Sequence, residues 1–567
     1  MNDTILKEKT MKKAFIYGLL FTVLVGGINA NANANLGIGV YQFASKLYTE
    51  ALGKGPDING WLFWVEDFLG EDGVTTEKLA MLGIIFYTSE EFYNIYDNDY
   101  RSMLLALYRG CFSREPDYDG FIFWLSKINN LYDWSLVVNA FFQSPAFKNE
   151  FAEAIISNQF VGWHSNSPVI SIQDEWTSSE LQNRINEAVE NETYLVEIPQ
   201  NTVIRVGQDS LHSGLACIVV HENVTLRTQG LDENYNAYAK MARIVRSSFI
   251  QDGLYSGELV ALKSGAKLEG IWIDGQRNIH GYDLKQINVF MTGNHNLDDN
   301  PTTIVGCRIS NTCGWTQLQS LNDYNYYEYW GMGTTSKIDI RQNLVTNYSG
   351  SHCLNLWSDG LSIGTSEGSV RYNMIIDPTD VGIVVYSNVL HPQNTQIYEN
   401  CIVNISNSAF SGIAADTNHR IVDESFSSSG VIKGTYQDPL PMQTLMENNY
   451  IWTSQAAHIN IAIAVGSGTW WHDGVVEGII AQNNTVGSIY YNANVGIGIA
   501  ISGVVNPIVQ HNQLFLELGN YTRESFNIGV DLSFYPQGEM PFNIQDNFEL
   551  YDSMLFFVIN DQYNLCE

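Results

Sequence analysis

Three aspartates in the second half of the chain are candidates for acid–base chemistry. Asp359 is followed by Asp380 after 21 residues, and Asp416 lies further along. Cleavage of a glycosidic bond needs two carboxyl groups, one to protonate the leaving oxygen and one to activate water or attack. We therefore treat these three residues as candidate catalytic residues. The alternative is a structural role, because an Asp in a turn caps its own backbone.

A second group of side chains could bind the substrate of such a site. Exposed aromatic rings stack on the apolar faces of sugars, and aromatic residues gather in two runs, 324–331 and 468–473. The candidate substrate-binding residues are His352, Trp357, His419, Arg420, Tyr327, Trp330, Trp470 and Trp471. The alternative is that the histidines occupy exposed corners and that the rings fold back onto the protein.

A polysaccharide lyase would need different groups, namely a base and a means of neutralising a uronate carboxylate. Basic residues are sparse beyond residue 340, although Arg371 and Arg420 could serve, with Asp377 and Asp416 as Ca²⁺ ligands. The sequence contains no dense calcium motif and no Cys-x-x-Cys pair. We therefore expect no metal and no other cofactor, with Ca²⁺ as the exception if the protein is a lyase.

The segments that would position these residues carry a repeated signature, apolar-x-x-Asn-x-apolar. The repeated position is Ile271, Cys307, Asn343, Asn373, Asn400, Asn449, Asn484 and Asn512, with a frayed last copy at Asn547. The spacing between copies varies, as expected for constant strands joined by loops of variable length. An Asn at a fixed corner can adopt the left-handed conformation, and stacked amides can hydrogen-bond from coil to coil.

A second strand recurs after Gly360, Gly382, Gly412 and Gly496, with apolar residues at period two. Together the two repeats predict an all-β, right-handed, single-stranded parallel β-helix of about ten coils over residues 174–567. Near its start, Thr177 and Glu180 form a capping box before an apolar helical stripe. We expect this helix to close the unpaired N-terminal end of the coil.

These repeats, with the entry segment around Leu268 to Gly275, resemble the pectin-lyase-like superfamily of right-handed β-helices. The resemblance implies a polysaccharide lyase, hydrolase, esterase or epimerase, or a phage tailspike or adhesin. Ser358-Asp359-Gly360 is similar to the Asn-Thr-Asp-Gly motif of polygalacturonases, and Asp380 falls where that family has Asp-Asp. However, the first Asp of that pair is Thr379 here and the Gly-His-Gly motif is missing, so we do not expect polygalacturonase activity.

Residues 38–160 contain a different repeat, with a period of 60 residues at Pro56 and Pro116 and again at Trp64 and Trp124. In each copy Pro-Asp opens a turn, the Asp can cap a helix, and apolar residues follow at helical spacing. We expect a small all-α domain with these rings in its core, joined to the coil by a linker at 161–173. The Pro-Asp-x-x-Gly-x-x-x-Trp pattern resembles an uncharacterised helical repeat domain of secreted and surface-layer bacterial proteins, which implies attachment or self-association.

The composition restricts the location and the partners of the chain. The 567 residues carry a formal net charge of −32, which disfavours nucleic acid and anionic lipid as partners. Residues 1–34 read as a signal peptide, with lysines before an apolar run too short to span a membrane. We therefore expect a secreted or cell-surface protein, not inserted in the membrane, with its natural start at Met1 or Met11.

Two functions remain open at the level of sequence. The first is a secreted polysaccharide hydrolase or lyase acting on an extracellular glycan. The second is a non-catalytic surface or adhesion protein in which a β-helix presents loops and the helical domain attaches to the cell surface or to other copies.

Overall fold

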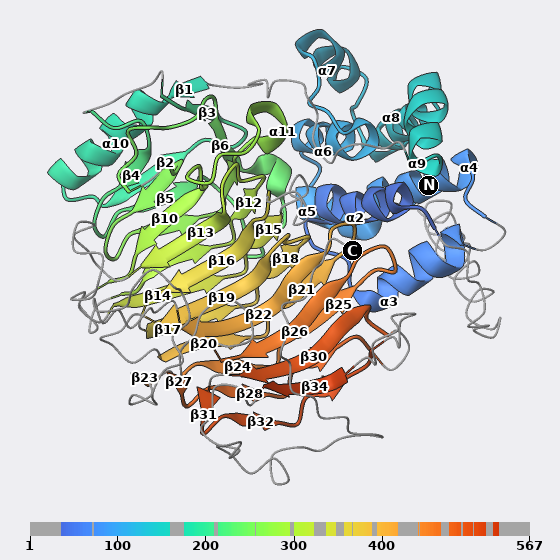
Figure 1. Ribbon diagram of the computed structural model, residues 1–567. Helices are drawn as coiled ribbons and strands as arrows, with labels where there is room; N and C mark the ends of the chain where they lie inside the picture. Colours follow the sequence, from blue (N-terminus) through green and yellow to red (C-terminus); the bar gives the residue numbers. More distant parts are fainter. Residues whose placement is uncertain are drawn as a thin grey trace, which may run out of the picture.

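The computed structural model describes residues 36–70, 73–158, 175–208, 214–255, 257–294, 300–321, 336–346, 356–365, 367–387, 394–417, 440–441, 443–466, 476–488, 492–502, 504–516 and 526–531. Within these ranges a helical module is followed by a long coil of strands, and the module lies against one flank of the coil (Figure 1). None of the described helices is both long and apolar enough to cross a membrane.

The helical module consists of two copies of a similar set of helices. Their bounds are α2 (Ile38–Leu52), α3 (Ile58–Trp61), η1 (Leu62–Leu69), α4 (Thr76–Tyr87), α5 (Glu90–Tyr96), α6 (Tyr100–Phe112), α7 (Tyr118–Leu125), α8 (Leu131–Phe142), η2 (Phe147–Ala152) and α9 (Glu153–Ile156). The Asp of each Pro-Asp motif caps the next helix: Asp57 accepts from the backbone of Gly60 and Asp117 from that of Gly120, both at 2.8 Å.

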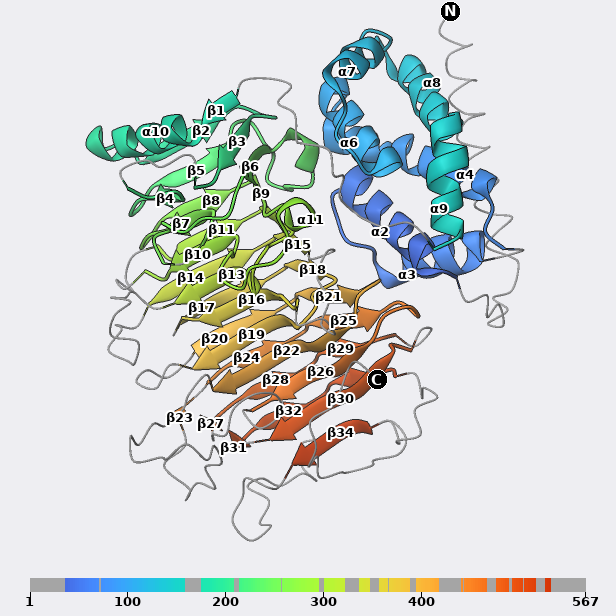
Figure 2. The ribbon, with the colours of Figure 1, turned by 45° about the horizontal axis from the view of Figure 1, so that its top comes forward.

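The coil is built from three long parallel sheets, each with one strand per turn of the coil (Figures 1 and 2). Sheet 1 contains β1 (Glu175–Thr177), β3 (Val203–Val206), β6 (Ala242–Arg246), β9 (Ile271–Asp274), β12 (Arg308–Ser310), β15 (Leu344–Thr346), β18 (Met374–Ile376), β21 (Cys401–Asn404), β25 (Tyr450–Thr453), β29 (Thr485–Val486) and β33 (Gln513–Leu514). Sheet 2 contains β4 (Ile218–Val220), β7 (Val260–Leu262), β10 (Val289–Thr292), β13 (Thr316–Leu321), β16 (Asp359–Gly364), β19 (Val381–Ser387), β22 (Ala409–Thr417), β26 (Ile459–Val465), β30 (Val495–Ser502) and β34 (Phe526–Asp531).

Sheet 3 contains β2 (Leu195–Ile198), β5 (Thr225–Thr228), β8 (Lys267–Glu269), β11 (Thr302–Val305), β14 (Lys337–Arg341), β17 (Glu367–Arg371), β20 (Asn394–Tyr398), β24 (Leu445–Glu447), β28 (Ile480–Gln482) and β32 (Ile508–Gln510). A short fourth sheet joins β23 (Leu440–Pro441), β27 (Val476–Glu477) and β31 (Val504–Val505). Each coil passes through sheet 3, then sheet 1, then sheet 2. The predicted right-handed parallel β-helix of about ten coils is confirmed.

The interior of the coil is filled by columns of branched apolar side chains. In sheet 2, for example, Leu361 lies beside Ile383 on the next coil, and Ile383 lies beside Ile413, all fully buried. Strands stacked at about 4.8 Å bring each side chain onto its equivalent in the next coil. The helix α10 (Ser178–Glu190) begins at the capping box of Thr177 and Glu180 and packs Leu181 and Ile185 onto this interior.

The repeated asparagines form a buried ladder at the corner between sheets 3 and 1. The side-chain amide of each donates to the side-chain oxygen of the next at 2.9–3.0 Å, along Asn343, Asn373, Asn400, Asn449, Asn484 and Asn512. The predicted coil-to-coil stacking is therefore confirmed. The copy expected at Asn547 lies outside the described residues.

The backbone conformation predicted for the ladder was wrong. The left-handed residue is not the asparagine but the residue before it, such as Gln342, Tyr372 and Glu399, with φ of 56°, 56° and 54°. In two earlier coils this position is Gly270 or Gly306. The left-handed residue turns the chain, so that the side chain of the asparagine after it can point inward. There the asparagine can exchange hydrogen bonds with the asparagines of the neighbouring coils.

The position predicted for the repeated glycine of sheet 2 was wrong in one coil. Gly360 lies against the carbonyl of Gly382, and Gly382 against that of Gly412, so that an added Cβ would lie 2.4 to 2.5 Å from that oxygen. Further along the coil, Ile413 pairs with Ile463, and Ile463 pairs with Ile499. The residues just before the last two, Ala462 and Gly498, therefore continue the column from Gly412. Gly496, which the sequence pattern suggested, lies two residues away from it.

The helical module is fixed to sheet 1 by buried ion pairs. Arg308 on β12 donates to both carboxylate oxygens of Glu50 on α2, at 2.6 and 3.2 Å. Glu115, after α6, accepts from Arg109 at 2.9 Å and from Arg243 on β6 at 2.7 Å. Because Glu50, Glu115, Arg243 and Arg308 are almost completely buried, these ion pairs lie inside the junction between the module and the coil.

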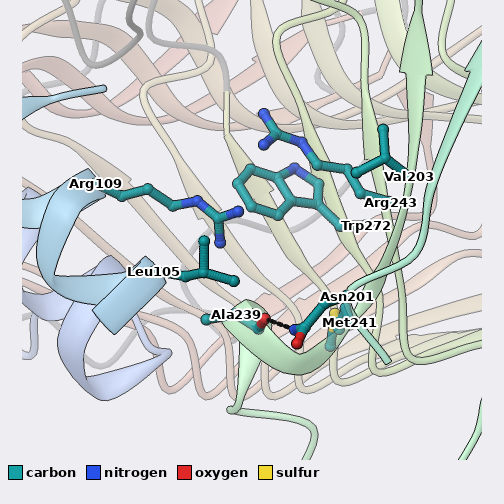
Figure 3. A pocket seen from close by; sticks show the side chains of 8 residues that line it. All are labelled: Leu105, Arg109, Asn201, Val203, Ala239, Met241, Arg243 and Trp272. Carbon is teal, nitrogen blue, oxygen red and sulfur yellow. Dashed lines mark hydrogen bonds between the residues drawn. The ribbon is translucent and has the colours of Figure 1, made fainter. Parts of the chain in front are cut away.

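Aromatic and apolar residues complete this junction. Trp61 of α3 meets Trp452 of β25 edge-on at 5.7 Å, and both side chains are fully buried. Higher up, the Trp272 ring lies between the guanidiniums of Arg109 and Arg243, at 4.9 and 3.8 Å (Figure 3). A small cavity between α6 and sheet 1 is lined by Leu105, Arg109, Asn201, Val203, Ala239, Met241, Arg243 and Trp272.

Candidate functional site

The structure brings Asp359 and Asp380 together on the outer face of sheet 2. Asp359 begins β16, and Asp380 directly precedes β19 on the next coil. The backbone N–H of Val381 donates to the Asp359 carboxylate at 3.1 Å, which holds the two aspartates side by side. Asp359 and Asp380 are 2% and 5% exposed, and Val381 belongs to an apolar cluster separate from the core of the coil.

Both carboxyl groups are buried, and their environment favours the protonated form. Burial raises the pKa of Asp359 to about 7, opposed by its hydrogen bonds from Ser362 Oγ and from Val381. Burial also raises the pKa of Asp380 well above its ordinary value, and the negative charge of Asp359 raises it further. Two adjacent buried carboxyls cannot readily ionise together. We therefore expect the pair to hold at least one proton near neutral pH.

The segment that leads into Asp359 is held by an arginine from an earlier coil. Arg277 lies on the short helix α11 (Arg277–His280) and donates to Ser358 Oγ at 2.8 Å and to the Leu356 carbonyl. Ser358 Oγ donates to the Gly314 carbonyl at 2.6 Å, and the Ser358 N–H donates to Thr379 Oγ1 at 2.9 Å. These bonds fix the backbone immediately before Asp359, and they fix the hydroxyl of Thr379 immediately before Asp380.

A phenol borders the pair and contacts the backbone that leads into Asp359. The Tyr282 hydroxyl donates to the Trp357 carbonyl at 3.3 Å, and the Arg277 guanidinium stacks 4.6 Å from the Tyr282 ring centre. Burial raises the pKa of Tyr282 to about 12, with Arg277 acting against it and the charges of Asp380 and Asp359 adding to it. Tyr282 and Trp357 are both half-buried.

Asp416 is not brought to this pair. It lies near the end of β22, where its backbone is in register with Tyr386 of β19. Phe410, six residues earlier, is the residue whose N–H donates to the Asp380 carbonyl, at 2.8 Å. At about 3.3 Å per residue, six residues of strand separate Asp416 from the pair by roughly 20 Å.

Most of the residues predicted to bind substrate cannot be placed. Those that lie outside the described residues are His352, His419, Arg420, Tyr327, Trp330, Trp470 and Trp471. Asp377, considered above as a Ca²⁺ ligand, has a structural role. Its carboxylate accepts from the backbone of Ile405 at 2.6 Å and of Ser406 at 2.9 Å, and so supports a turn on the next coil.

Three residues of the site were missed by the sequence interpretation, namely Arg277, Tyr282 and Ser362. Arg277 and Ser358 are 81 positions apart, and only the pitch of the coil brings them into contact. The entry segment before Gly275 was recognised as similar to a known family, but no pattern extended that signal to Arg277. Among the described residues, no group of three or more His, Cys, Asp or Glu side chains could hold a metal ion.

The arrangement can carry out acid–base chemistry. A protonated carboxyl beside an ionised one supplies a proton donor and an acceptor at one place, which is the minimum needed to assist departure of an alcohol oxygen and to activate water. The cavity in Figure 3 is not part of this arrangement, because its arginines are engaged with Glu115 at the junction with the helical module.

No protein-family model matches the sequence, and no curated protein matches it either. Solved structures with similar folds include the A-module of a mannuronan C-5 epimerase from Azotobacter vinelandii, at 12% identity and a TM-score of 0.31, covering 62% of this chain and 93% of that one. The Dettilon tailspike protein matches at 12% identity and a TM-score of 0.35, covering 70% of each chain. The tailspike of Escherichia coli bacteriophage HK620, solved with a pentasaccharide, matches at 12% identity and a TM-score of 0.26, covering 67% of this chain and 74% of that one.

Proposed function

We propose that the chain is an exported, glycan-acting β-helix protein in which Asp359 and Asp380 form the acid–base pair. The observation that carries the proposal is the side-by-side placement of two buried carboxyls on the outer face of sheet 2. The saccharides named for the epimerase and for the bacteriophage tailspike agree with this proposal but are not its basis.

The proposed roles follow from the proton affinities of the two groups. Asp380, whose pKa is raised both by burial and by its neighbour, keeps its proton and acts as the general acid toward the leaving oxygen. Asp359, held by Ser362 and Val381, is the ionised partner that activates water or attacks the sugar carbon. Arg277 positions the segment before Asp359, and Trp357 offers a ring for a sugar face.

The substrate is proposed to be an extracellular polysaccharide, cleaved by hydrolysis. The lyase alternative would need a uronate substrate and a neutralising group such as Ca²⁺. The full chain should therefore be tested on a panel of neutral and acidic polysaccharides, with reducing ends and absorbance at about 235 nm measured in parallel. Reducing ends without unsaturated ends select hydrolysis, and unsaturated ends that require Ca²⁺ select the lyase.

The roles of the pair are tested by Asp380→Asn and Asp359→Asn, each expected to lower kcat at least about 100-fold. Asp283→Asn is the matched control, because Asp283 is an exposed carboxylate next to Tyr282 and contacts the Lys285 backbone. Full activity in Asp380→Asn would refute the proposal. Glycan binding without turnover by the wild-type chain would support instead the non-catalytic adhesion function.

Export is a separate part of the proposal and has its own test. Residues 1–34 are proposed to be a cleaved signal peptide, with the protein released or held at the cell surface. Intact mass measurement of the protein recovered from outside a producing cell should give a chain beginning near residue 31 to 35. A mass that includes the lysine-rich leader would contradict this part of the proposal and leave the carboxyl pair unaffected.

A further inference from the structure

The two repeats of the helical module present the same helix to different surroundings. Helix α7 follows α3 by 60 residues, so that Tyr118 corresponds to Ile58 and Ile122 to Leu62. In the first repeat, Ile58 is 6% exposed and packs in one cluster with Trp452 of the coil. In the second repeat, Tyr118 is 61% exposed and Ile122 is 42% exposed. The coil therefore covers this surface in one copy and leaves it uncovered in the other.

The uncovered surface extends over two helices. The α7–α8 face is defined by its exposed large apolar residues, which are Tyr118, Ile122, Phe123, Leu131, Tyr132 and Leu136. Helices α7 and α8 lie at the end of the module that points away from the coil (Figure 2). Large apolar side chains that gather on one exposed surface usually mark a contact with a partner.

The α7–α8 face begins only a few residues after the junction with the coil. Glu115 is buried there between Arg109 and Arg243, and Tyr118, three residues later, is already exposed. The junction combines apolar contacts, such as that of Trp61 with Trp452, with ion pairs, such as that of Glu50 with Arg308. A partner for the α7–α8 face should offer the same combination of an apolar centre and complementary charges.

The charges of α7 are self-complementary. Asp117 and Asp119 are exposed at its N-terminal end, and Lys127 is exposed just beyond its C-terminal end. Two copies of α7 packed antiparallel would place Lys127 of each copy near Asp119 of the other. In the first repeat the residue that corresponds to Lys127 is Asp67, so α3 and η1 lack this complementarity.

We propose that the α7–α8 face is the contact surface of a symmetric dimer of this chain, with the two α7 helices antiparallel across a twofold axis. Such an isologous contact uses the same patch on both subunits and closes, so it yields dimers and not open filaments. Apolar burial supplies the affinity, and the pairing of Lys127 with Asp119 fixes the orientation. The proposal does not depend on the function proposed for the carboxyl pair.

The first test is sedimentation equilibrium of the full chain over a range of concentrations. Wild type should approach twice the monomer mass, and the double substitution Ile122→Glu with Phe123→Glu should sediment as a monomer. Met81→Glu is the matched control, because Met81 is 45% exposed on α4 in the first repeat, and this variant should remain dimeric. A wild type that stays monomeric at the highest concentration would overturn the proposal, whether or not that chain binds a glycan.

A charge exchange tests the orientation without altering the apolar residues. Lys127→Asp should weaken the dimer at least about fivefold in Kd, since it places like charges against each other. Adding Asp119→Lys in the same chain should restore the wild-type Kd. If both variants dimerise as wild type does, or if restoration fails while the thermal midpoints are unchanged, the antiparallel arrangement is wrong.

Discussion

Two regions of this molecule bury carboxyl groups beside opposite kinds of partner. At the junction with the helical module, Glu50 faces the guanidinium of Arg308. Burial alone would raise its pKa, but Arg308 outweighs it and lowers the pKa of Glu50 to about 2. On the outer face of sheet 2, Asp359 lies beside the carboxyl of Asp380, and burial raises the pKa of Asp359 to about 7. At the junction the buried carboxyl is therefore held in its ionised form by an arginine, whereas on sheet 2 burial favours the protonated form.

The asparagine ladder is a further set of buried polar side chains, and it shows what stacking does when no charge is present. The asparagine ladder repeats a polar side chain on successive coils, as the aspartate pair does, but with neutral amides that each donate and accept. Stacked polar groups are therefore stable in this coil when their hydrogen bonds are complete. The aspartate pair differs because neither ionised carboxylate can donate to the other.

The largest effect is expected when a carboxylate is placed in the ladder. Asn400 donates to the Val370 carbonyl at 2.8 Å and to Asn449 Oδ1 at 3.0 Å. Asn400→Asp would set a carboxylate against both acceptors, at a cost of about 4–5 kcal/mol in the free energy of unfolding at pH 7. Chemical denaturation checks this, with the exposed ladder-side residue Asn483→Asp as control. A cost below about 1 kcal/mol would mean that the ladder tolerates charge.

Removing one member of the ion pair at the junction is expected to have the next largest effect. Glu50→Gln leaves the Arg308 guanidinium buried without its counter-charge, which should cost about 3–5 kcal/mol. At neutral pH we expect the helical module and the coil to unfold in a single transition, and this free energy should be lost from that transition. Below the ordinary pKa of Glu50 the difference from wild type should shrink, because the wild-type pair loses its stabilisation as pH falls toward about 2.

The aspartate pair should give a pH dependence of the opposite sign. A carboxyl whose pKa is higher in the folded state than in the unfolded state holds extra protons between the two values, so stability falls as pH rises. For Asp359 this window runs from its ordinary value of 3.8 to about 7, with a slope of at most about 1.4 kcal/mol per pH unit. Asp359→Asn should remove that slope in denaturation curves recorded from pH 4 to pH 8. An unchanged slope would show that Asp359 ionises normally.

The smallest effect is expected from the positioning arginine. Arg277→Lys keeps the charge but cannot reach both Ser358 Oγ and the Leu356 carbonyl, which should cost about 1 kcal/mol of stability. If the proposed function holds, kcat should fall several-fold with KM little changed, and the pH profile should shift, because the segment before Asp359 loosens. Wild-type kcat and pH profile in this variant would assign Arg277 to stability alone.

The sequence was sufficient to predict the coil, because its repeats are local. A six-residue pattern around Asn343 and its equivalents contains the strand, the corner and the inward amide, so the ladder could be predicted without knowing the loop lengths. The preceding left-handed residue was missed because Gln342, Tyr372 and Glu399 share no chemistry, and only the backbone reveals what they have in common.

The site could be predicted only in part, because it depends on contacts between coils. Asp359 and Asp380 were singled out from their turn motifs, and the regular pitch brought them together. Asp416 was included on the same reasoning but lies at the other end of its strand. Arg277 comes from an earlier coil, and the variable loops between coils hide such pairings from any fixed spacing in the sequence.

The central claim is that the aspartate pair keeps a proton at neutral pH. Infrared difference spectra of wild type against Asp359→Asn and Asp380→Asn test this most directly, with the carbonyl band of a protonated carboxylic acid followed from pH 5 to pH 9. We predict that wild type shows this band at pH 7, that it disappears only on further increase of pH, and that the variants alter it. A spectrum at pH 7 in which these two substitutions remove only carboxylate bands would contradict the claim.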